Sequence, residues 1–232
     1  MASIIAVTNQ KGGVGKTTTA INLAASLAAS ERRVLLIDGD PQGNASSGLG
    51  ITPDAVPSTL YDVLIDGREP STAIHQAVHF PGLDVLAATA DLAGAEVELV
   101  GEVGRELVLR RAIEPIRASY DFVLIDCPPS LGLLTINMLS AADSLIIPLQ
   151  CEYFALEGLT QLLRTVNLVH QRLNPNLQIF GVLLTMYDAR LNLSRQVADD
   201  ARDHFGTLVF NTIIPRNIRL AEAPSFGRPI VT

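Results

Sequence analysis

The sequence predicts a single α/β domain, residues 1–232, in which helices cover both faces of a mainly parallel, twisted sheet to give three layers. Apolar runs of strand length alternate along the chain with segments of helical spacing, which is the pattern of repeated strand–helix–strand units. Several runs, including 33–37 and 122–125, are almost entirely apolar, as expected for strands buried on both sides. Right-handed crossovers then bring the carboxyl ends of the strands to one edge, where functional residues gather.

The individual elements follow from these two patterns in chain order. Residues 3–8 are a short apolar run and residues 17–29 are rich in Ala and Leu with helical spacing, so the chain opens with a strand, a glycine-rich loop and a helix. The predicted strands are 3–8, 33–37, 83–87, 121–125, 144–149, 178–185 and 208–213. The predicted helices are 17–29, 58–66, 91–100, 104–118, 131–141, 157–173 and 194–204. No repeat or long linker divides them, so the length favours one domain.

The glycine-rich loop after the first strand holds both lysines of the chain. Lys11 and Lys16 flank the segment Gly12-Gly13-Val14-Gly15, whereas the other fifteen basic residues are all arginine. A compact ammonium suits a polyphosphate oxygen better than a broad guanidinium fork does. Two lysines kept at one glycine-rich turn therefore indicate a phosphate-binding site.

A strand, a glycine-rich loop and a helix in this order are typical of a nucleotide-binding P-loop. Glycines let successive backbone N–H groups turn inward around an anion, and the helix N-terminus adds partial positive charge. We expect Lys16 to reach the β- and γ-phosphates and the hydroxyl of Thr17, which Thr18 follows, to ligate Mg²⁺. Gln10 replaces the usual first glycine, so the motif is a deviant one. The alternative is a purely structural turn before a helix.

Asp126 ends the apolar run that forms the predicted strand 121–125, and Cys127-Pro128-Pro129 then turns the chain. A hydrophobic strand that ends in Asp is the Walker B arrangement, whose carboxylate holds Mg²⁺, usually through water. Many strands end in Asp, so this signal depends on the P-loop that precedes it.

Two further aspartates, Asp38 and Asp40, follow the predicted strand 33–37. Residues two apart on a strand point to the same side, so the two carboxylates can share one face. One carboxylate near the γ-phosphate would orient or deprotonate the attacking water, and we favour Asp40 for this role. The alternative is an Asp-Pro turn in which these side chains only cap backbone amides.

Composition narrows the function classes further. No apolar stretch reaches the roughly 18 residues of a membrane span, and Met1 leads directly into the first strand, so no secretory signal is expected. Cys127 and Cys151 give neither a disulfide framework nor metal spacing, and the four histidines are scattered. The net charge of −7 is uneven, since residues 190–232 carry +2 and residues 1–189 carry −9. An anionic partner would therefore dock on the C-terminal part, although an ordinary surface also gives differences this small.

These motifs resemble the deviant-Walker ATPases of the ParA/Soj/MinD class. The resemblance rests on Lys11-Gly12-Gly13-Val14-Gly15-Lys16-Thr17-Thr18, on Asp38-Gly39-Asp40-Pro41-Gln42-Gly43-Asn44 and on Asp126-Cys127-Pro128-Pro129-Ser130. Further stretches, at 148–158, 188–190 and 214–227, are similar to the ParA/Soj chromosome-partitioning proteins in particular. The resemblance covers the whole chain.

The resemblance implies Mg²⁺ and ATP as cofactors and a homodimer that sandwiches ATP. Lys11 would reach across to the partner subunit's phosphates, as an arginine finger does, with Gly12 leaving room for the close approach of the two subunits. Asp40 would position the hydrolytic water, and Thr17, Asp40 and Asp126 would surround the metal. Pro215 and Asn217 would contact the adenine.

The family also implies partners outside the dimer. The ATP-bound dimer would bind double-stranded DNA without sequence preference through Arg190 and Arg219, with Arg216 as a further candidate. Two subunits double the number of phosphate contacts, so DNA binding should require dimerisation and weaken as salt rises. A ParB/Spo0J-type protein would stimulate hydrolysis and release the dimer, which implies a cytoplasmic, nucleoid-associated protein.

Three rival functions remain open at this point. One is a nucleotide-dependent scaffold that hydrolyses nothing, and the presence of Asp40 argues against it. A MinD-like membrane-positioning switch needs a basic amphipathic helix near its C-terminus, and residues 205–232 show no such pattern. An iron–sulfur reductase needs cysteine thiolates at a dimer interface, and no fitting pair is evident. Relatives continue with a loop and a final helix beyond the position of Thr232, so we expect this domain either to lack that helix or to be shortened.

Overall fold

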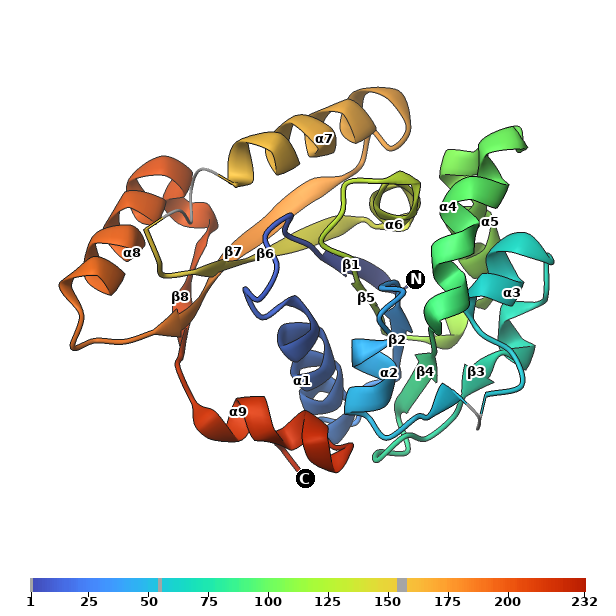
Figure 1. Ribbon diagram of the computed structural model, residues 1–232, viewed down its shortest axis with the longest axis horizontal. Coiled ribbons are helices and arrows are strands. Elements are labelled where there is room, and N and C mark those ends of the chain that lie inside the picture. The colour runs from blue at the N-terminus through green and yellow to red at the C-terminus, as the bar shows by residue number, and fades with distance from the viewer. Residues whose placement is uncertain (1, 54–55, 154–157) are drawn as a thin grey trace.

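The computed structural model describes residues 2–53, 56–153 and 158–232. Within these residues one eight-stranded sheet runs in the order β3-β4-β2-β5-β1-β6-β7-β8 (Figure 1). The strands are β1 (Ser3–Val7), β2 (Val34–Asp38), β3 (Ile74–His75), β4 (Leu83–Leu86), β5 (Phe122–Asp126), β6 (Ser144–Gln150), β7 (Gln178–Tyr187) and β8 (Val209–Pro215). Every neighbouring pair is parallel except β3 with β4. The predicted mainly parallel α/β fold is therefore confirmed.

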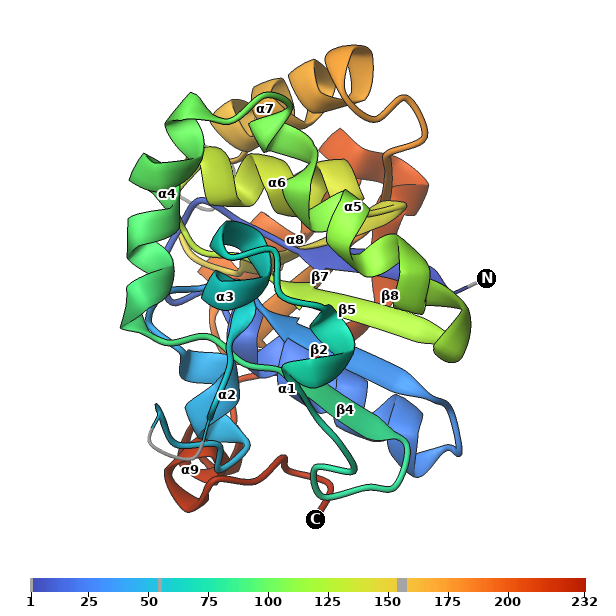
Figure 2. The ribbon, with the colours of Figure 1, turned by 90° about the vertical axis from the view of Figure 1, so that its right-hand side faces the viewer.

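Helices cover both faces of the sheet, as the three-layer prediction requires. They are α1 (Lys16–Ala29), α2 (Asn44–Gly48), α3 (Leu60–Ile65), α4 (Ala95–Glu98), α5 (Val108–Ile113), α6 (Leu133–Ala141), α7 (Leu159–Arg172), α8 (Asn192–Phe205) and α9 (Ile218–Glu222). Figures 1 and 2 show α1, α2 and α9 on one side of the sheet and α5, α6 and α7 on the other. Among the described helices none is long and apolar enough to cross a membrane.

The central strand β1 shows how the sequence builds two cores from one sheet. Ile4 and Ala6 belong to the cluster under α3 and α5–α8, whereas Ile5 and Val7 belong to the cluster under α1 and α2. Successive side chains of a strand point to opposite faces, so a strand covered on both sides must be apolar at every position. This is why the fully apolar runs predicted the strands that carry the site.

The helices at the periphery differ most from the sequence prediction. The predicted helix 91–100 is three short pieces, a 3-10 turn at Ala90–Gly94, α4, and a 3-10 turn at Leu99–Gly101. The predicted helix 104–118 is α5 between two 3-10 segments, and Pro115 stands at the start of the second one. Glycine lowers helix stability, and proline lacks the N–H that an α-helix uses. The glycines and Pro115 therefore interrupt the two predicted helices.

Three elements were not predicted, because each is too short to show a period: β3, α2 and α9. Position 157, where the predicted helix 157–173 begins, lies outside the described residues, as do 154–157 of the family-like stretch 148–158. The rest of that predicted helix is α7.

Candidate functional site

The loop between β1 and α1 has the backbone geometry that its glycines predict. Gly13 and Gly15 adopt positive φ angles of 72° and 88°, a region that side chains with a Cβ seldom enter. Gly15 is the N-cap of α1, and no side chain caps that helix end. The first N–H groups of α1 therefore point into the loop, where an anion would bind them.

Side chains from distant parts of the chain hold this loop in place. The Asn9 amide donates to the Pro148 carbonyl oxygen over 2.7 Å, and the Asn9 side-chain oxygen accepts from the Lys11 N–H over 3.0 Å. From β7, the Thr185 hydroxyl donates to the Val14 carbonyl oxygen over 2.9 Å. The loop is thus attached to both β6 and β7. The sequence of the loop did not indicate that Thr185 contacts it.

Lys16 lies inside the loop and not on the surface. Its side chain is buried, and its Nζ donates to the Lys11 carbonyl oxygen over 3.2 Å. Burial lowers the pKa of Lys16, while the nearby carboxylates of Asp126 and Asp40 act in the opposite direction. A desolvated ammonium that faces the loop interior is placed to bind an anion there.

Asp126 stands at the end of β5, fully buried, and neither of its carboxylate oxygens has a hydrogen-bond partner of standard geometry among the described residues. Burial, and secondarily the charge of Asp38, raises the pKa of Asp126 well above its ordinary value, whereas Thr17 and Lys16 act to lower it. Thr17 is thus close to this carboxylate. Unpaired buried oxygens are costly, and a hydrated Mg²⁺ would satisfy them, so the residues fit the metal that the sequence predicted.

The described residues contain no group of three or more His, Cys, Asp or Glu side chains that could hold a metal by themselves. The predicted set of Thr17, Asp40 and Asp126 agrees with this, because Mg²⁺ in nucleotide sites is bound by one or two carboxylates together with substrate phosphates and water. The site therefore fits a metal that arrives with a nucleotide.

Asp38 and Asp40 have different environments. Asp38 is fully buried and accepts hydrogen bonds from the Ser46 N–H (2.8 Å), the Ser46 hydroxyl (2.7 Å) and the Asp40 N–H (3.2 Å). Burial raises its pKa to about 6. Asp40 is also buried and accepts from the Gln42 N–H over 3.0 Å through Oδ1. Asp38 thus organises the turn into α2, and Asp40 stands beside Lys16.

A pocket of about 200 Å³ adjoins the loop where the adenine was expected. Gly15 and Thr18 line one side, and Pro215 and Asn217 line the other. Met186, which also lines it, has a positive φ of 50°, a strained conformation that is typical of functional sites. The structure therefore brings the predicted adenine residues to the P-loop, and Met186 is a pocket residue that the sequence did not indicate.

The Lys11 side chain contacts the segment that follows β6. Its ammonium lies 3.8 Å from Glu152 Oε2, while Glu152 Oε1 lies 3.5 Å from the Arg216 guanidinium. The Gln150 amide also donates to Glu152, over 2.5 Å. Glu152 therefore joins the predicted trans-acting lysine to the adenine-side loop, a connection that the sequence did not indicate.

The three arginines predicted to bind DNA fall into two groups. Arg190 is 88% exposed at its side chain and makes a two-pronged ion pair with Asp188, and Arg219 is exposed on α9. Arg216 lines the adenine-side pocket and pairs with Glu152. All three arginine side chains are thus exposed, and Arg216 also lines the pocket beside the glycine loop.

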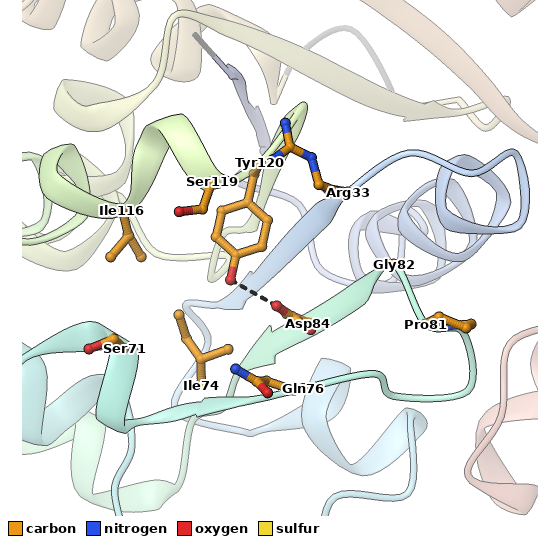
Figure 3. Close-up of a pocket in the computed structure, with 10 residues that line it drawn as sticks. All are labelled: Arg33, Ser71, Ile74, Gln76, Pro81, Gly82, Asp84, Ile116, Ser119 and Tyr120. Atoms are coloured by element: carbon orange, nitrogen blue, oxygen red, sulfur yellow. Dashed lines mark hydrogen bonds between the residues drawn. The ribbon is translucent and has the colours of Figure 1, made fainter.

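A second hollow, of about 360 Å³, lies at the opposite edge of the sheet, where β2, β4 and β5 begin (Figure 3). The Tyr120 hydroxyl donates to Asp84 over 2.9 Å, and the Ala77 N–H donates to the other oxygen of that carboxylate over 3.0 Å. Burial is the main cause that raises the pKa of Tyr120, so the phenol stays protonated. This network closes the end of the sheet and contains none of the predicted site residues.

The sequence is similar to one family model and to several known proteins. A family model described as an AAA domain matches residues 2–179. The chain is 58% identical over 228 residues to the chromosome partitioning protein ParA of Myxococcus xanthus, covering 98% of this chain and 80% of that protein. It is 58% identical over 231 residues to the sporulation initiation inhibitor protein Soj of Bacillus subtilis, covering 100% and 91%.

A solved structure shares both the fold and the sequence. It is called cobyrinic acid a,c-diamide synthase, comes from Mycobacterium smegmatis and contains an ATP analogue and magnesium. It superposes with a TM-score of 0.88 at 43% identity, covering 98% of this chain and 93% of that one.

Proposed function

The chain belongs to the ParA/Soj family of chromosome-partitioning ATPases, and from that premise we propose that its Mg-ATP-bound homodimer binds DNA and is released by hydrolysis. The nucleotide part is supported by two buried groups beside the glycine loop: the Lys16 ammonium, and the Asp126 carboxylate, which has no hydrogen-bond partner of standard geometry among the described residues. The magnesium-containing relative from Mycobacterium smegmatis supports the choice of ligand.

Each residue of the loop has a distinct part in binding. The N–H groups of Gly13 to Thr18 and the Lys16 ammonium would bind the phosphates, and Thr17 and Asp126 would hold Mg²⁺. When bound, the metal ion neutralises charge that develops on the transferred phosphoryl group. Pro215 and Asn217 would contact the adenine from the far side of the adjoining pocket.

Asp40 would orient the water that attacks the γ-phosphate. Its Oδ1 is held by the Gln42 N–H, so the carboxylate is oriented by the backbone that carries it. Its charge acts on Lys16, which supports a role for Asp40 near the phosphates. Positioning of this kind is the main part that a protein plays in phosphoryl transfer.

Lys11 would complete the site of a second subunit. Its ammonium is exposed enough to move, because the side chain is 34% accessible and the ion pair that it forms with Glu152 is long. The Lys11 ammonium pairs with Glu152, whereas the Lys16 ammonium is bonded within the loop, and in a face-to-face dimer Lys11 would meet the partner's triphosphate. ATP binding and dimerisation would then be a single event.

The dimer would bind double-stranded DNA without sequence preference through Arg190 and Arg219. Both side chains are exposed and come from different segments, so two subunits present four guanidinium groups to the phosphates. A ParB/Spo0J-type protein would stimulate hydrolysis and free the dimer from DNA. This cycle implies a cytoplasmic, nucleoid-associated protein.

The family assignment and the two cysteines bear on the membrane-positioning and iron–sulfur alternatives. Membership of the ParA/Soj family replaces the MinD-like alternative. Cys127 and Cys151 are buried free thiols, and burial raises the pKa of both, that of Cys151 to about 11. Neither is a thiolate poised to bind an iron–sulfur cluster at a subunit surface.

The test is DNA binding with no nucleotide, ADP and ATP, run beside size-exclusion chromatography. We expect Asp40→Ala to bind ATP, to dimerise and to remain on DNA without releasing phosphate. Lys16→Ala serves as the control that binds no nucleotide. A protein that stays monomeric with ATP, or an Asp40→Ala variant with normal phosphate release, would refute the proposal.

A further inference from the structure

His79, in the loop between β3 and β4, holds two distant parts of the chain together. Its Nε2 lies 3.0 Å from the Leu49 carbonyl oxygen, just after α2, and 2.8 Å from the Gly227 carbonyl oxygen, near the C-terminus. Carbonyl oxygens only accept hydrogen bonds, so Nε2 carries a proton that both oxygens share. The two carbonyls are 30 and 148 positions away from His79 along the chain. One side chain therefore joins three segments that are far apart in sequence.

The backbone of the β3–β4 loop is held in an unusual conformation around this histidine. Ala77 and His79 adopt positive φ angles of 55° and 62°, a region that residues with a Cβ enter at a cost in free energy. Val78 and Phe80, on either side of His79, pack against the core cluster under α1 and α2. The His79 side chain is exposed. A strained residue between two packed neighbours indicates that the position of this ring has a function.

Two glycines bring the segments that His79 joins into direct backbone contact. Gly50 and Gly227 have positive φ angles of 80° and 64°, and a Cβ on Gly227 would lie 2.9 Å from the Gly50 Cα. A Cβ on Gly48, in α2, would lie 3.5 Å from the Pro224 side chain. Figures 1 and 2 show the part of the chain that contains α9 beside α2. The hydrogen bonds of His79 therefore close a contact between two segments that already pack together.

The segment that His79 holds carries Arg219, one of the arginines proposed to bind DNA. We call residues 218–227 the C-terminal segment. It consists of α9, the 3-10 turn Ala223–Phe226 and Gly227, and neither α9 nor this turn contains a buried residue. A helix of 5 residues is not stable in water without tertiary contacts. The orientation of Arg219 therefore depends on the contacts that hold the two ends of the C-terminal segment.

Different side chains hold these two ends. At the start, the Asn217 side-chain oxygen accepts from the Arg219 N–H over 2.9 Å and caps α9. At the end, His79 donates to the carbonyl oxygen of the last residue. Three residues further on, the Ile230 N–H donates to the Asn22 side-chain oxygen of α1 over 2.8 Å. Asn217 was predicted as an adenine contact, whereas no sequence pattern indicated His79.

The other partner of His79 belongs to a helix that is itself fixed to the catalytic side of the sheet. α2 begins four residues after Asp40, and Ser46 within it donates two hydrogen bonds to the buried Asp38. Leu49, whose carbonyl oxygen accepts from His79, is buried and directly follows α2. His79 thus fastens the C-terminal segment to a rigid part of the domain.

We propose that His79 is a positioning residue for DNA binding, which fixes the C-terminal segment to α2 and so holds Arg219 in the orientation that contacts a DNA phosphate. The inference rests on the proposed function, because it explains how one of the two DNA-binding arginines is held. Contacts between guanidinium groups and phosphates are directional, so a segment released at one end would lose affinity. A purely structural role for His79 would lower stability and leave the affinity of the folded dimer for DNA unchanged.

The test measures binding of a mixed-sequence double-stranded DNA fragment by fluorescence anisotropy, with Mg²⁺ and a non-hydrolysable ATP analogue, at several salt concentrations. His79→Asn keeps a residue that tolerates the positive φ angle but is too short to reach both carbonyl oxygens. It should bind DNA at least about threefold more weakly, with a smaller salt dependence, because a phosphate contact is lost. Nucleotide affinity and ATP-dependent dimerisation should stay within about twofold of wild type. His79→Gln, whose amide N–H can reach the position of Nε2, should restore most of the DNA affinity.

A double-mutant cycle tests whether His79 acts through Arg219. His79→Asn/Arg219→Ala should bind DNA within about twofold of Arg219→Ala alone, because the arginine that His79 positions is already absent. His79→Asn/Arg190→Ala should instead show the product of the two separate losses, since Arg190 lies on a different segment. His170→Asn is the matched control, because this exposed imidazole contacts the Leu177 carbonyl oxygen from α7, on the other side of the sheet.

A second variant disturbs the same contact from the C-terminal segment. Gly227→Asn keeps a residue that tolerates a positive φ angle, but its Cβ would press against Gly50. We expect it to reproduce the loss of DNA affinity seen in His79→Asn.

The remaining outcomes separate this inference from the proposed function. Wild-type DNA affinity in both His79→Asn and Gly227→Asn, or a further loss when His79→Asn is added to Arg219→Ala, would overturn the inference and leave the ATPase cycle intact. Loss of ATP-dependent dimerisation in His79→Asn would likewise overturn it, because His79 would then support the dimer as a whole. A wild-type protein that neither dimerises with the nucleotide nor binds DNA would refute the proposed function itself.

Discussion

Lys11 and Glu152 form an ion pair within one chain, with 3.8 Å between the ammonium and the nearer carboxylate oxygen. The same lysine is the residue that we expect to bind a second subunit's phosphates. The two contacts compete, because the Lys11 ammonium cannot bind Glu152 and the partner subunit's phosphates at the same time. The monomer is thereby stabilised against dimerisation by the amount that this pair contributes.

Glu152→Gln should therefore make dimerisation easier. An exposed ion pair contributes about 0.2–1 kcal/mol, so the ATP concentration at half-dimerisation should fall by up to about fivefold. Analytical ultracentrifugation across an ATP titration measures this. Asp199→Asn, which removes an exposed carboxylate from its pair with Arg202, is the control, and a weaker dimer in Glu152→Gln would contradict the competition.

Replacement of Lys16 and replacement of Lys11 should impair different properties, ATP binding in the first case and dimerisation in the second. Lys16→Ala removes the buried ammonium and should weaken ATP binding at least about 100-fold, on the order of 3 kcal/mol. Lys11→Ala should bind ATP nearly normally and remain monomeric. A fluorescent ATP analogue and size-exclusion chromatography distinguish the two, and equal nucleotide affinity in wild type and Lys16→Ala would refute the loop assignment.

Asp126→Asn should stabilise the nucleotide-free protein and inactivate it. Three carboxylates, those of Asp38, Asp40 and Asp126, interact around one buried ammonium, and burial penalises each negative charge. Removing one charge should raise the free energy of unfolding by on the order of 1 kcal/mol at pH 8. Urea denaturation without nucleotide, and phosphate release with Mg-ATP, measure the two effects. Unimpaired phosphate release would remove Asp126 from the metal site.

Arg190→Ala and Arg219→Ala should weaken DNA binding without changing basal ATP hydrolysis. Each substitution removes two guanidinium groups per dimer. If both of these groups contact phosphates, the magnitude of the slope of log affinity against log salt should fall by about 2. Electrophoretic mobility shifts at several salt concentrations measure the slope. Arg202→Ala on α8 tests whether any surface arginine has the same effect.

Tyr120→Phe should affect stability alone. The substitution removes a donor to Asp84 at the edge of the sheet far from the loop, and a lost hydrogen bond costs about 1 kcal/mol. Thermal unfolding measures the change, and phosphate release should be unaltered. The control is Tyr61→Phe, whose hydroxyl contacts an exposed carboxylate, so its loss should cost less.

The sequence predicted the strands and the loop well, because their signals are local. A strand such as β1 that is buried on both faces must be apolar throughout, and a phosphate loop needs its glycines and lysine within a few positions. Lys16, Thr17 and Asp126 could therefore be proposed as site residues from short motifs. The structure also separates Asp38 from Asp40 by giving the first one three backbone and hydroxyl donors.

The residues that sequence reasoning missed act through long-range contacts. Thr185 and Val14 are 171 positions apart, and Glu152 meets Lys11 only because β6 lies beside β1. Met186 has an unusual backbone angle that no side-chain pattern encodes. The predicted helix 91–100 is divided at positions near glycines. Whether a glycine interrupts a helix at the periphery of the fold depends on how that segment packs, so the sequence pattern did not indicate the division.

The hydrogen bonds that hold the glycine loop to β6 and β7 can form only late in synthesis of the chain. Asn9 and Val14 leave the ribosome early, but Pro148 and Thr185 emerge much later, and they hold the loop only then. At about 5–20 residues per second, the 171 positions between Val14 and Thr185 correspond to roughly 10–30 s of translation. We therefore expect a nascent chain to bind ATP only after the segment that carries Thr185 has left the ribosome.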